Sequence, residues 1–174
     1  MIRLANENDI SRIKEIYEHI HNAEEEGKAV IGWKRNVYPT ERTVLEGLSN
    51  KDLFVEENEN TIVATARINQ RQVKEYADCQ WLYQAADNEV MVLHTLVVDP
   101  LVKGKGYGAE FVKFYEEYAA SRNCNYLRID TQEKNMAARK FYKKFGFREA
   151  GDVFCNFNGI PDVRLVCLEK KLEI

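Results

Sequence analysis

A mainly apolar run lies near the middle of the chain, at Val90–Val98, and predicts a buried strand. The run stops at Asp99-Pro100, because proline can neither donate a ladder hydrogen bond nor prolong a strand. A short loop follows, and then apolar side chains recur at spacings of three, one, three and one residue from Phe111 to Ala119. These positions share one face of a helix. The centre of the chain is therefore expected to be a strand, a loop and a helix.

The N-terminal part predicts a short strand and two helices. Ile2–Ala5 reads as the strand, and Asn8 or Asp9 is expected to cap a helix that runs through Ile20. Thr40 is expected to cap a second helix, Thr40–Leu48. The intervening stretch has no clear periodicity and is expected to be a long loop with some helical turns.

The remaining elements alternate between strands and helices. They are an antiparallel hairpin (Asp52–Glu57 and Thr61–Asn69), a polar insertion with a short helix (Gln70–Asn88), a strand (Tyr126–Thr131), a helix (Asn135–Lys144) and a terminal antiparallel strand pair (Phe147–Phe154 and Val163–Lys171). This order predicts a single α/β (α+β) domain over residues 1–174, a sandwich with a mixed, mainly antiparallel central sheet flanked by helices. A parallel strand pair is expected where helical crossovers intervene.

The central loop carries the most specific chemical signal. It reads Lys103-Gly104-Lys105-Gly106-Tyr107-Gly108 and leads directly into a helix. Backbone N–H groups at such a helix start favour anions, which predicts a phosphate site. A Walker A loop is excluded because the spacing differs and no Ser or Thr follows in register, and the glycine spacing also differs from the dinucleotide fingerprint.

Two motifs together resemble one family. Lys103-x-x-Gly106-x-Gly108 is similar to the Arg/Gln-x-x-Gly-x-Gly/Ala loop of the GNAT N-acetyltransferases, where backbone amides grip the pyrophosphate of acetyl-CoA. Downstream, Asn135–Phe147 matches the family's Asn-x-x-Ala-x-x-Phe-Tyr-x-x-x-Gly-Phe helix. The resemblance covers most of the chain, and Lys103 departs from the usual Arg or Gln. In this family the two parallel strands splay apart to make a slot for the pantetheine arm.

The resemblance implies a role for each motif residue. The implied acetyl-CoA contacts are Leu96, Val97 and Val98 of the strand end, Lys103, Gly104, Lys105, Gly106, Tyr107 and Gly108 of the loop, and Asn135, Ala138 and Tyr142 of the downstream helix. Tyr142 is implied to protonate the departing thiolate as general acid, although a hydrogen-bonded core tyrosine is the plain alternative. The chemistry suits a phenol, since the pKa values of a thiol and a phenol, roughly 8.5 and 10, differ little. The backbone N–H of Val98 is expected to polarise the thioester carbonyl.

An attacking amine must lose a proton, so a base or a water chain is needed. Glu89, just before the central strand, and His94, within it, are the candidates, because the family often places such a residue on that strand. The alternatives are a solvated glutamate and a hydrogen-bonded core histidine. The family strand also tends to carry a bulge, which would change the side chains that face the cleft. Trp33, Arg35 and Tyr38 are candidate acceptor-binding residues on the long loop, or they pack in the core.

The composition of the chain argues against several other classes of protein. The chain has 45% hydrophobic and 30% charged residues, so it is expected to be neither disordered nor membrane-spanning. A net charge of −3 argues against a nucleic-acid partner. The four cysteines, Cys79, Cys124, Cys155 and Cys167, lie far apart without histidines at zinc-like spacing, so no metal is expected. No signal peptide precedes the first strand, and we expect a cytoplasmic protein with reduced thiols.

The resulting functional hypothesis is an acetyl-CoA-dependent N-acetyltransferase that acts on a primary amine of a small molecule by direct attack. A catalytically silent acyl-CoA sensor and a peptide or protein N-acetyltransferase are the alternatives, since function lies in the site and not in the fold. A homodimer is a family-level expectation. The sequence does not identify the acceptor.

Overall fold

The computed structural model describes residues 1–102 and 104–173. Its elements are β1 (Ile2–Leu4), η1 (Glu7–Asp9), α1 (Ile10–Glu25), α2 (Glu41–Ser49), β2 (Leu53–Asn58), β3 (Thr61–Asn69), η2 (Lys74–Asp78), η3 (Asp87–Glu89), β4 (Val90–Val98), α3 (Tyr107–Ser121), β5 (Tyr126–Gln132), α4 (Met136–Lys144), β6 (Arg148–Phe157) and β7 (Ile160–Lys171). The strands follow the order β1-β2-β3-β4-β5-β7-β6 in one seven-stranded sheet. The expected mixed, mainly antiparallel sheet with helices is confirmed.

The chain forms two compact units. The first comprises Met1–Ala29, Trp33–Ile68 and His94–Phe114, and the second comprises Val30–Gly32, Asn69–Leu93 and Tyr115–Ile174. Strand β4 contributes its first four residues to the second unit and the rest to the first. Each unit is described on its own.

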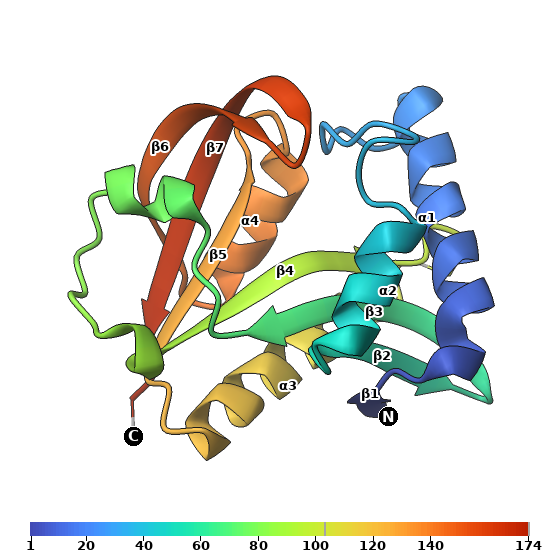
Figure 1. The fold of residues 1–174 in the computed structure, drawn as a ribbon, viewed down its shortest axis with the longest axis horizontal. Coiled ribbons are helices and arrows are strands. Elements are labelled where there is room, and N and C mark those ends of the chain that lie inside the picture. The colour runs from blue at the N-terminus through green and yellow to red at the C-terminus, as the bar shows by residue number, and fades with distance from the viewer. Residues whose placement is uncertain (103, 174) are drawn as a thin grey trace. The chain divides into compact units, whose positions relative to one another are not determined.

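In the first unit, β1, β2 and β3 pair antiparallel, as the sequence predicts. Glu59 and Asn60 make the β2–β3 turn with φ values of 48° and 62°, the left-handed conformation that two-residue hairpin turns require. Figure 1 shows α1 and α2 beside β2 and β3. Ile13 and Ile16 of α1 are fully buried, so the apolar face read from the sequence is the face that packs.

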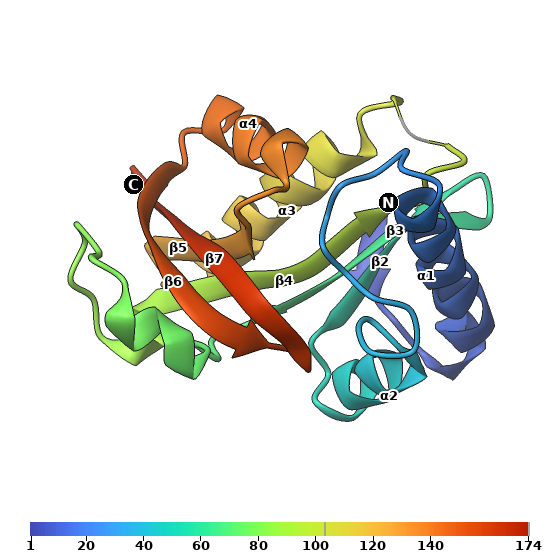
Figure 2. The same ribbon diagram turned by 90° about the horizontal axis from the view of Figure 1, so that it is seen from above.

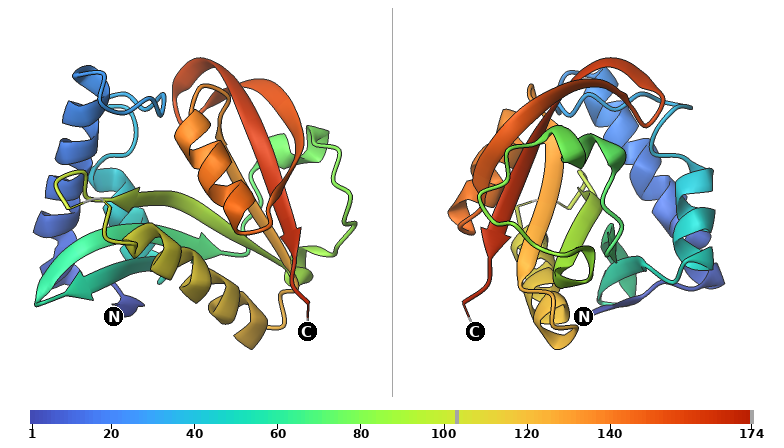
Figure 3. Two further views of the ribbon diagram at one scale, coloured as in Figure 1. Left: turned by 180° about the vertical axis from the view of Figure 1, so that it is seen from behind. Right: turned by 60° about the vertical axis from the view of Figure 1, so that its left-hand side comes forward.

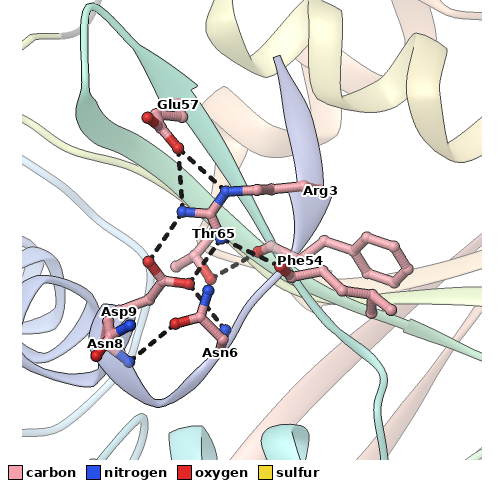
Figure 4. Close-up of polar contacts among 8 residues, drawn as sticks. Arg3, Asn6, Asn8, Asp9, Phe54, Glu57 and Thr65 are labelled. Atoms are coloured by element: carbon pink, nitrogen blue, oxygen red, sulfur yellow. Dashed lines mark hydrogen bonds and ion pairs between the residues drawn. The ribbon is translucent and has the colours of Figure 1, made fainter.

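A polar network fixes the start of α1 (Figure 4). Arg3 of β1 donates to both carboxylate oxygens of Asp9, at 2.8 and 3.0 Å, and to Glu57 of β2 at 3.0 Å. The Asn6 side chain accepts from the N–H of Asn8 at 2.9 Å, and Asp9 accepts from the N–H of Asn6 at 2.8 Å. Asp9 is the N-cap residue of α1, as predicted, but it makes no side-chain capping bond to that helix. The side-chain cap is supplied by Asn6 to the short η1 turn that precedes α1.

In the second unit, β4 and β5 form the predicted parallel pair. Their ladder joins Val90–Leu93 to Tyr126–Ile129, and both strands continue beyond it. The hydroxyl of Tyr115 from α3 donates to the backbone oxygens of Met91 and Arg128, at 2.7 and 3.2 Å, and so ties the two strands together within the ladder. The terminal hairpin turns at Asn158-Gly159, so the connection is shorter than the gap between the predicted strands, which end at Phe154 and begin at Val163. Both β6 and β7 extend further toward the turn than their apolar patterns indicate.

The insertion before β4 belongs to the second unit and packs against its strands. Tyr76 of η2 is buried in a cluster with Val90, Val92 and Cys167, and the segment runs beside β5 and β7 in Figures 2 and 3. Glu169 of β7 accepts from the N–H of Leu82 at 2.8 Å. The insertion contains two short 3-10 turns where one short helix was expected.

Cys79 of the insertion and Cys167 of β7 form a disulfide with Cα atoms 6.8 Å apart. The expectation of reduced thiols is wrong for this pair. The reason is tertiary: folding the insertion back onto β7 brings together two cysteines 88 residues apart in sequence. Cys124 and Cys155 are free thiols.

Candidate active site

The end of β4 in the first unit is conformationally unusual. Thr95 has φ 55° inside the strand, a conformation that is a genuine outlier for a β-branched residue. Such strain persists only where surrounding contacts hold it, and it is concentrated at functional sites. The Tyr38 hydroxyl and Thr95 Oγ1 form a short hydrogen bond that contributes to this hold. The irregularity lies in the strand for which a bulge was expected.

The three candidate acceptor residues separate into two groups. The rings of Trp33 and Tyr38 meet edge to face with centroids 6.0 Å apart, so Trp33 joins the group around Thr95. Arg35 instead donates to Glu25 of α1 at 2.8 Å and pairs with Glu18. The guanidinium of Arg35 is therefore committed to the surface of α1, whereas Trp33 and Tyr38 adjoin the distorted part of β4.

The glycine loop connects β4 to α3. Lys103 lies outside the described residues, and Lys105 is exposed. Gly104 and Gly106 have φ values of 87° and 89°, and a Cβ built on either would have no heavy atom within 4 Å. Glycine is needed here for the backbone conformation and not for lack of room. The open surroundings leave the backbone accessible to a ligand, which fits a phosphate-binding loop at the start of α3.

Asp99 anchors the beginning of this loop. Its side chain is 1% exposed. The carboxylate accepts hydrogen bonds from Arg12 Nη2 at 2.5 Å and from the N–H of Leu101 at 3.0 Å, and it lies 2.9 Å from Nδ1 of His19. Burial opposes ionisation, but the bonds from Leu101, His19 and Arg12 outweigh it and lower the pKa of Asp99. His19 is thus a structural partner of the loop. His21 of the same helix is 3% exposed, and its Nε2 forms a hydrogen bond with the backbone oxygen of Pro39.

The strand end beside the loop offers backbone groups. The N–H of Asp99 donates to Val63 of β3 at 2.8 Å. Successive N–H groups of a strand point to opposite sides, so the N–H of Val98 points away from β3. Leu96 and Val98 are half-buried, while Val97 is 2% exposed.

In the second unit, α4 places the downstream motif. Asn135 Oδ1 accepts from the N–H of Ala138 at 3.1 Å, so Asn135 is the helix N-cap and its side-chain N–H groups remain available. Tyr142 is 7% exposed and packs against Phe141 and Phe147. Ala137 is exposed, because the buried face of α4 centres on Tyr142.

The Tyr142 hydroxyl differs from those of its buried neighbours. Among residues 1–102 and 104–173 it has no hydrogen-bond partner, so the hydrogen-bonded core tyrosine is not what the structure shows. Burial, assisted by the negative charge of Asp130, raises the pKa of Tyr142 well above that of a free phenol. The phenol is therefore protonated at neutral pH. The raised pKa also means that Tyr142 gives up its proton less readily than an ordinary phenol with a pKa of roughly 10.

The two base candidates have different surroundings. Glu89 is exposed, and its carboxylate accepts from the N–H of Ala86 at 3.0 Å, which closes the η3 turn. His94 is half-buried in β4. The η3 turn gives Glu89 a structural role, and the assignment of the base to Glu89 or His94 stays a prediction.

Comparison with known proteins identifies the family. A model of the "Acetyltransferase (GNAT) family" matches residues 10–147, well over half of the chain. The chain belongs to the GNAT acetyltransferase family.

GNAT proteins appear among both the curated relatives and the solved structures. An N-acetyltransferase of Methanocaldococcus jannaschii is 33% identical over 72 residues, which are 41% of this chain and 32% of that protein. The chain therefore matches only about a third of that relative's length. A GNAT acetyltransferase structure from Streptococcus agalactiae has a TM-score of 0.83 and 22% identity over 100% of this chain and 96% of its own. A Salmonella typhimurium acetyltransferase structure with its cofactor acetyl-CoA has a TM-score of 0.68 and 16% identity over 99% and 94%.

In this GNAT protein, two further aspartates, Asp130 and Asp99, make contacts that the sequence did not predict. Asp130 of β5 accepts from the Tyr76 hydroxyl at 2.6 Å and acts on the pKa of Tyr142. An Asp two residues after an arginine in an amphipathic strand carries no motif, so no sequence signal marks it. Asp99 could have been found, because Asp-Pro directly after a strand is a typical loop start. Among the described residues, no group of three or more His, Cys, Asp or Glu side chains could hold a metal, and no helix has the length and apolar character to cross a membrane.

Proposed function

We propose that this GNAT protein is an acetyl-CoA-dependent N-acetyltransferase that acetylates a primary amine of a small molecule by direct attack. The observation that carries the proposal is the loop after β4, with two glycines in left-handed conformations and an open backbone at the start of α3. The family match over residues 10–147 supports it.

The loop residues Gly104, Gly106 and Gly108 hold the pyrophosphate through backbone N–H groups, assisted by the positive end of the α3 dipole. Lys103, Lys105 and Tyr107 belong to the same loop, and the two lysines add positive charge. The C-terminal end of β4, Leu96 to Val98, forms backbone hydrogen bonds with the pantetheine amides, as if the pantetheine were a further strand of the sheet. Asn135 and Ala138 line the cofactor from the start of α4.

Acetyl-CoA supplies an acetyl thioester, whose carbonyl carbon accepts the amine and whose leaving group is a thiolate. The Val98 N–H points away from β3 and polarises the carbonyl oxygen. Tyr142 donates its proton to the thiolate sulfur as the carbon–sulfur bond breaks. The proton lost by the amine leaves through His94 or water, and Glu89 is the second candidate. Trp33 and Tyr38, near strained Thr95, contact the acceptor.

Thiol release from acetyl-CoA, measured with a panel of amines, amino acids, polyamines and peptides, tests the proposal. We expect release that depends on an amine, together with thermal stabilisation by CoA. Stabilisation by CoA without amine-dependent release would instead favour an acyl-CoA sensor. Release with peptides alone would favour the peptide or protein acceptor, and no effect of CoA would contradict the loop assignment.

A further inference from the structure

Buried carboxylates in this protein are, with few exceptions, paired with arginine. Asp9 pairs with Arg3, Asp52 with Arg67, Asp99 with Arg12 and Glu169 with Arg148. This is the usual rule, because an unpaired buried charge is strongly unfavourable. A buried carboxylate without such a partner is therefore informative.

Glu75 of η2 breaks the rule. It is 9% exposed, yet it has neither a hydrogen bond nor an ion pair within the described parts of the chain. Its charge raises the pKa of Asp130 of β5, and both carboxylates raise the pKa of the free thiol of Cys155 on β6, against the lowering effect of Lys74. The hydrogen bond from Tyr76, the residue after Glu75, to Asp130 places η2 beside β5.

Asp130 also lacks a cation. One oxygen, Oδ2, accepts from the Tyr76 hydroxyl at 2.6 Å, and Oδ1 accepts nothing from the residues that the structure describes. Arg128 precedes Asp130 on the same face of β5, but its guanidinium donates to Gln72 and to the oxygen of Tyr83 and lies 4.0 Å over the Trp81 ring. The cation that the sequence places nearest is therefore engaged elsewhere. Asp130 is only partly buried, so a ligand can reach it.

We propose that Glu75 and Asp130 bind a second, non-reacting ammonium group of the acceptor, so that the acceptor is a diamine or polyamine. The inference rests on the proposed acetyltransferase function and adds the substrate class. A carboxylate beside the reacting nitrogen would keep that nitrogen protonated and prevent attack, whereas a second ammonium benefits from being held in its charged form.

Electrostatics support this assignment. Burial and the neighbouring charge of Glu75 raise the pKa of Asp130 to about 6, against the lowering effect of the Tyr76 hydrogen bond. A bound ammonium would relieve the repulsion between the two carboxylates. It would also offset the charge of Asp130 that raises the pKa of Tyr142, and so ease proton donation to the thiolate.

The test compares putrescine and spermidine with butylamine, which has the same reacting group as putrescine but no second charge. Binding is measured by calorimetry with and without CoA, and kcat/KM is measured by thiol release. We expect the diamine to be preferred over butylamine by roughly tenfold or more, the scale of one charge-assisted hydrogen bond or ion pair. Glu75→Gln and Asp130→Asn should each reduce that preference.

Asp78→Asn is the matched control, because Asp78 is an exposed carboxylate on the same short element as Glu75. It should keep the preference of the unmodified protein. Equal binding of putrescine, spermidine and butylamine, or a preference that survives both Glu75→Gln and Asp130→Asn, would overturn the inference. CoA binding by the variants, read separately, shows that they are folded, and its absence in the unmodified protein would refute the proposed function instead.

Discussion

Tyr142 differs from Tyr76 and Tyr115 in what its hydroxyl contacts. Tyr76 donates to Asp130 and Tyr115 to two backbone oxygens, and these bonds give both hydroxyls a structural role. The Tyr142 hydroxyl has no such acceptor within the described residues. A buried, protonated phenol without a partner in the protein can donate its hydrogen bond to a ligand.

Tyr142→Phe is therefore expected to reduce kcat by roughly 100-fold, the lower end of general acid catalysis, with little change in CoA affinity. Steady-state thiol release and CoA titration measure the two quantities. Because burial raises the pKa of Tyr142, its ionisation should produce no loss of activity up to about pH 9. Unchanged turnover in the phenylalanine variant would remove Tyr142 from the mechanism.

Some site residues could be predicted from the sequence and others could not. The loop glycines and the α4 motif have fixed spacings in the sequence, so Gly106 and Tyr142 could be proposed as site residues from the sequence alone. Glu75 and Asp130 lie 55 positions apart in sequence and meet through an insertion whose path the sequence does not determine. The ion pairs of Arg35 could not be predicted for a similar reason, because its acidic partners on α1 become its neighbours only in the folded chain.

The loop after β4 is held to α1 by Asp99. Replacing the charge by Asp99→Asn leaves the guanidinium of Arg12 without its buried partner and weakens the turn at Leu101. We expect a loss of about 3 kcal/mol in the free energy of unfolding, measured in urea, and weaker CoA binding. Asp152→Asn is the comparison, because its pair with Arg164 is exposed and should contribute less than about 1 kcal/mol. Similar losses in the two variants would show that Asp99 is not the anchor.

The packing of the insertion before β4 could not be predicted from the spacing of its apolar residues. Tyr76 and Trp81 lie in a polar segment, and their packing on β4 and β7 depends on contacts far apart in sequence. The indole N–H of Trp81 donates to the backbone oxygen of Tyr76 at 2.8 Å, and the two rings meet edge to face with centroids 5.2 Å apart, which orders the segment locally. Elements with a strong pattern, such as α1 and the β2–β3 hairpin, were placed within a few residues, because their buried faces follow a fixed period.

At the scale of the whole molecule, the lowered pKa values of the buried carboxylates Asp9 and Asp99 favour the folded state at neutral pH, and Glu56 does the opposite. It is 1% exposed on β2, and Oε2 has no partner in the described residues. Burial, with the hydrogen bond and charge of Glu110 on α3, raises the pKa of Glu56 to about 8, while the N-terminal ammonium lowers it slightly. The folded state therefore retains a proton that the unfolded chain has lost above about pH 5.

As a result, this group makes the free energy of unfolding fall as pH rises from about 5 to about 8. Glu56→Gln should remove that decline and stabilise the protein at pH 8 by roughly 1–3 kcal/mol, as measured by urea unfolding across this range. Glu149, whose pKa is lowered by Arg139, has the opposite sign and acts only at acid pH. A variant whose pH dependence matches the unmodified protein would contradict a protonated Glu56.

The central claim is that the loop after β4 binds the pyrophosphate of acetyl-CoA, and CoA affinity of Gly106→Ala tests it most directly. The matched control is Gly27→Ala, since Gly27 at the end of α1 has φ 70° and the same open surroundings. Both substitutions should reduce stability by about 1–2 kcal/mol through backbone strain. Calorimetric titration with CoA is predicted to show at least a tenfold loss of affinity in Gly106→Ala alone. Equal affinities in the two variants and the unmodified protein would contradict the account.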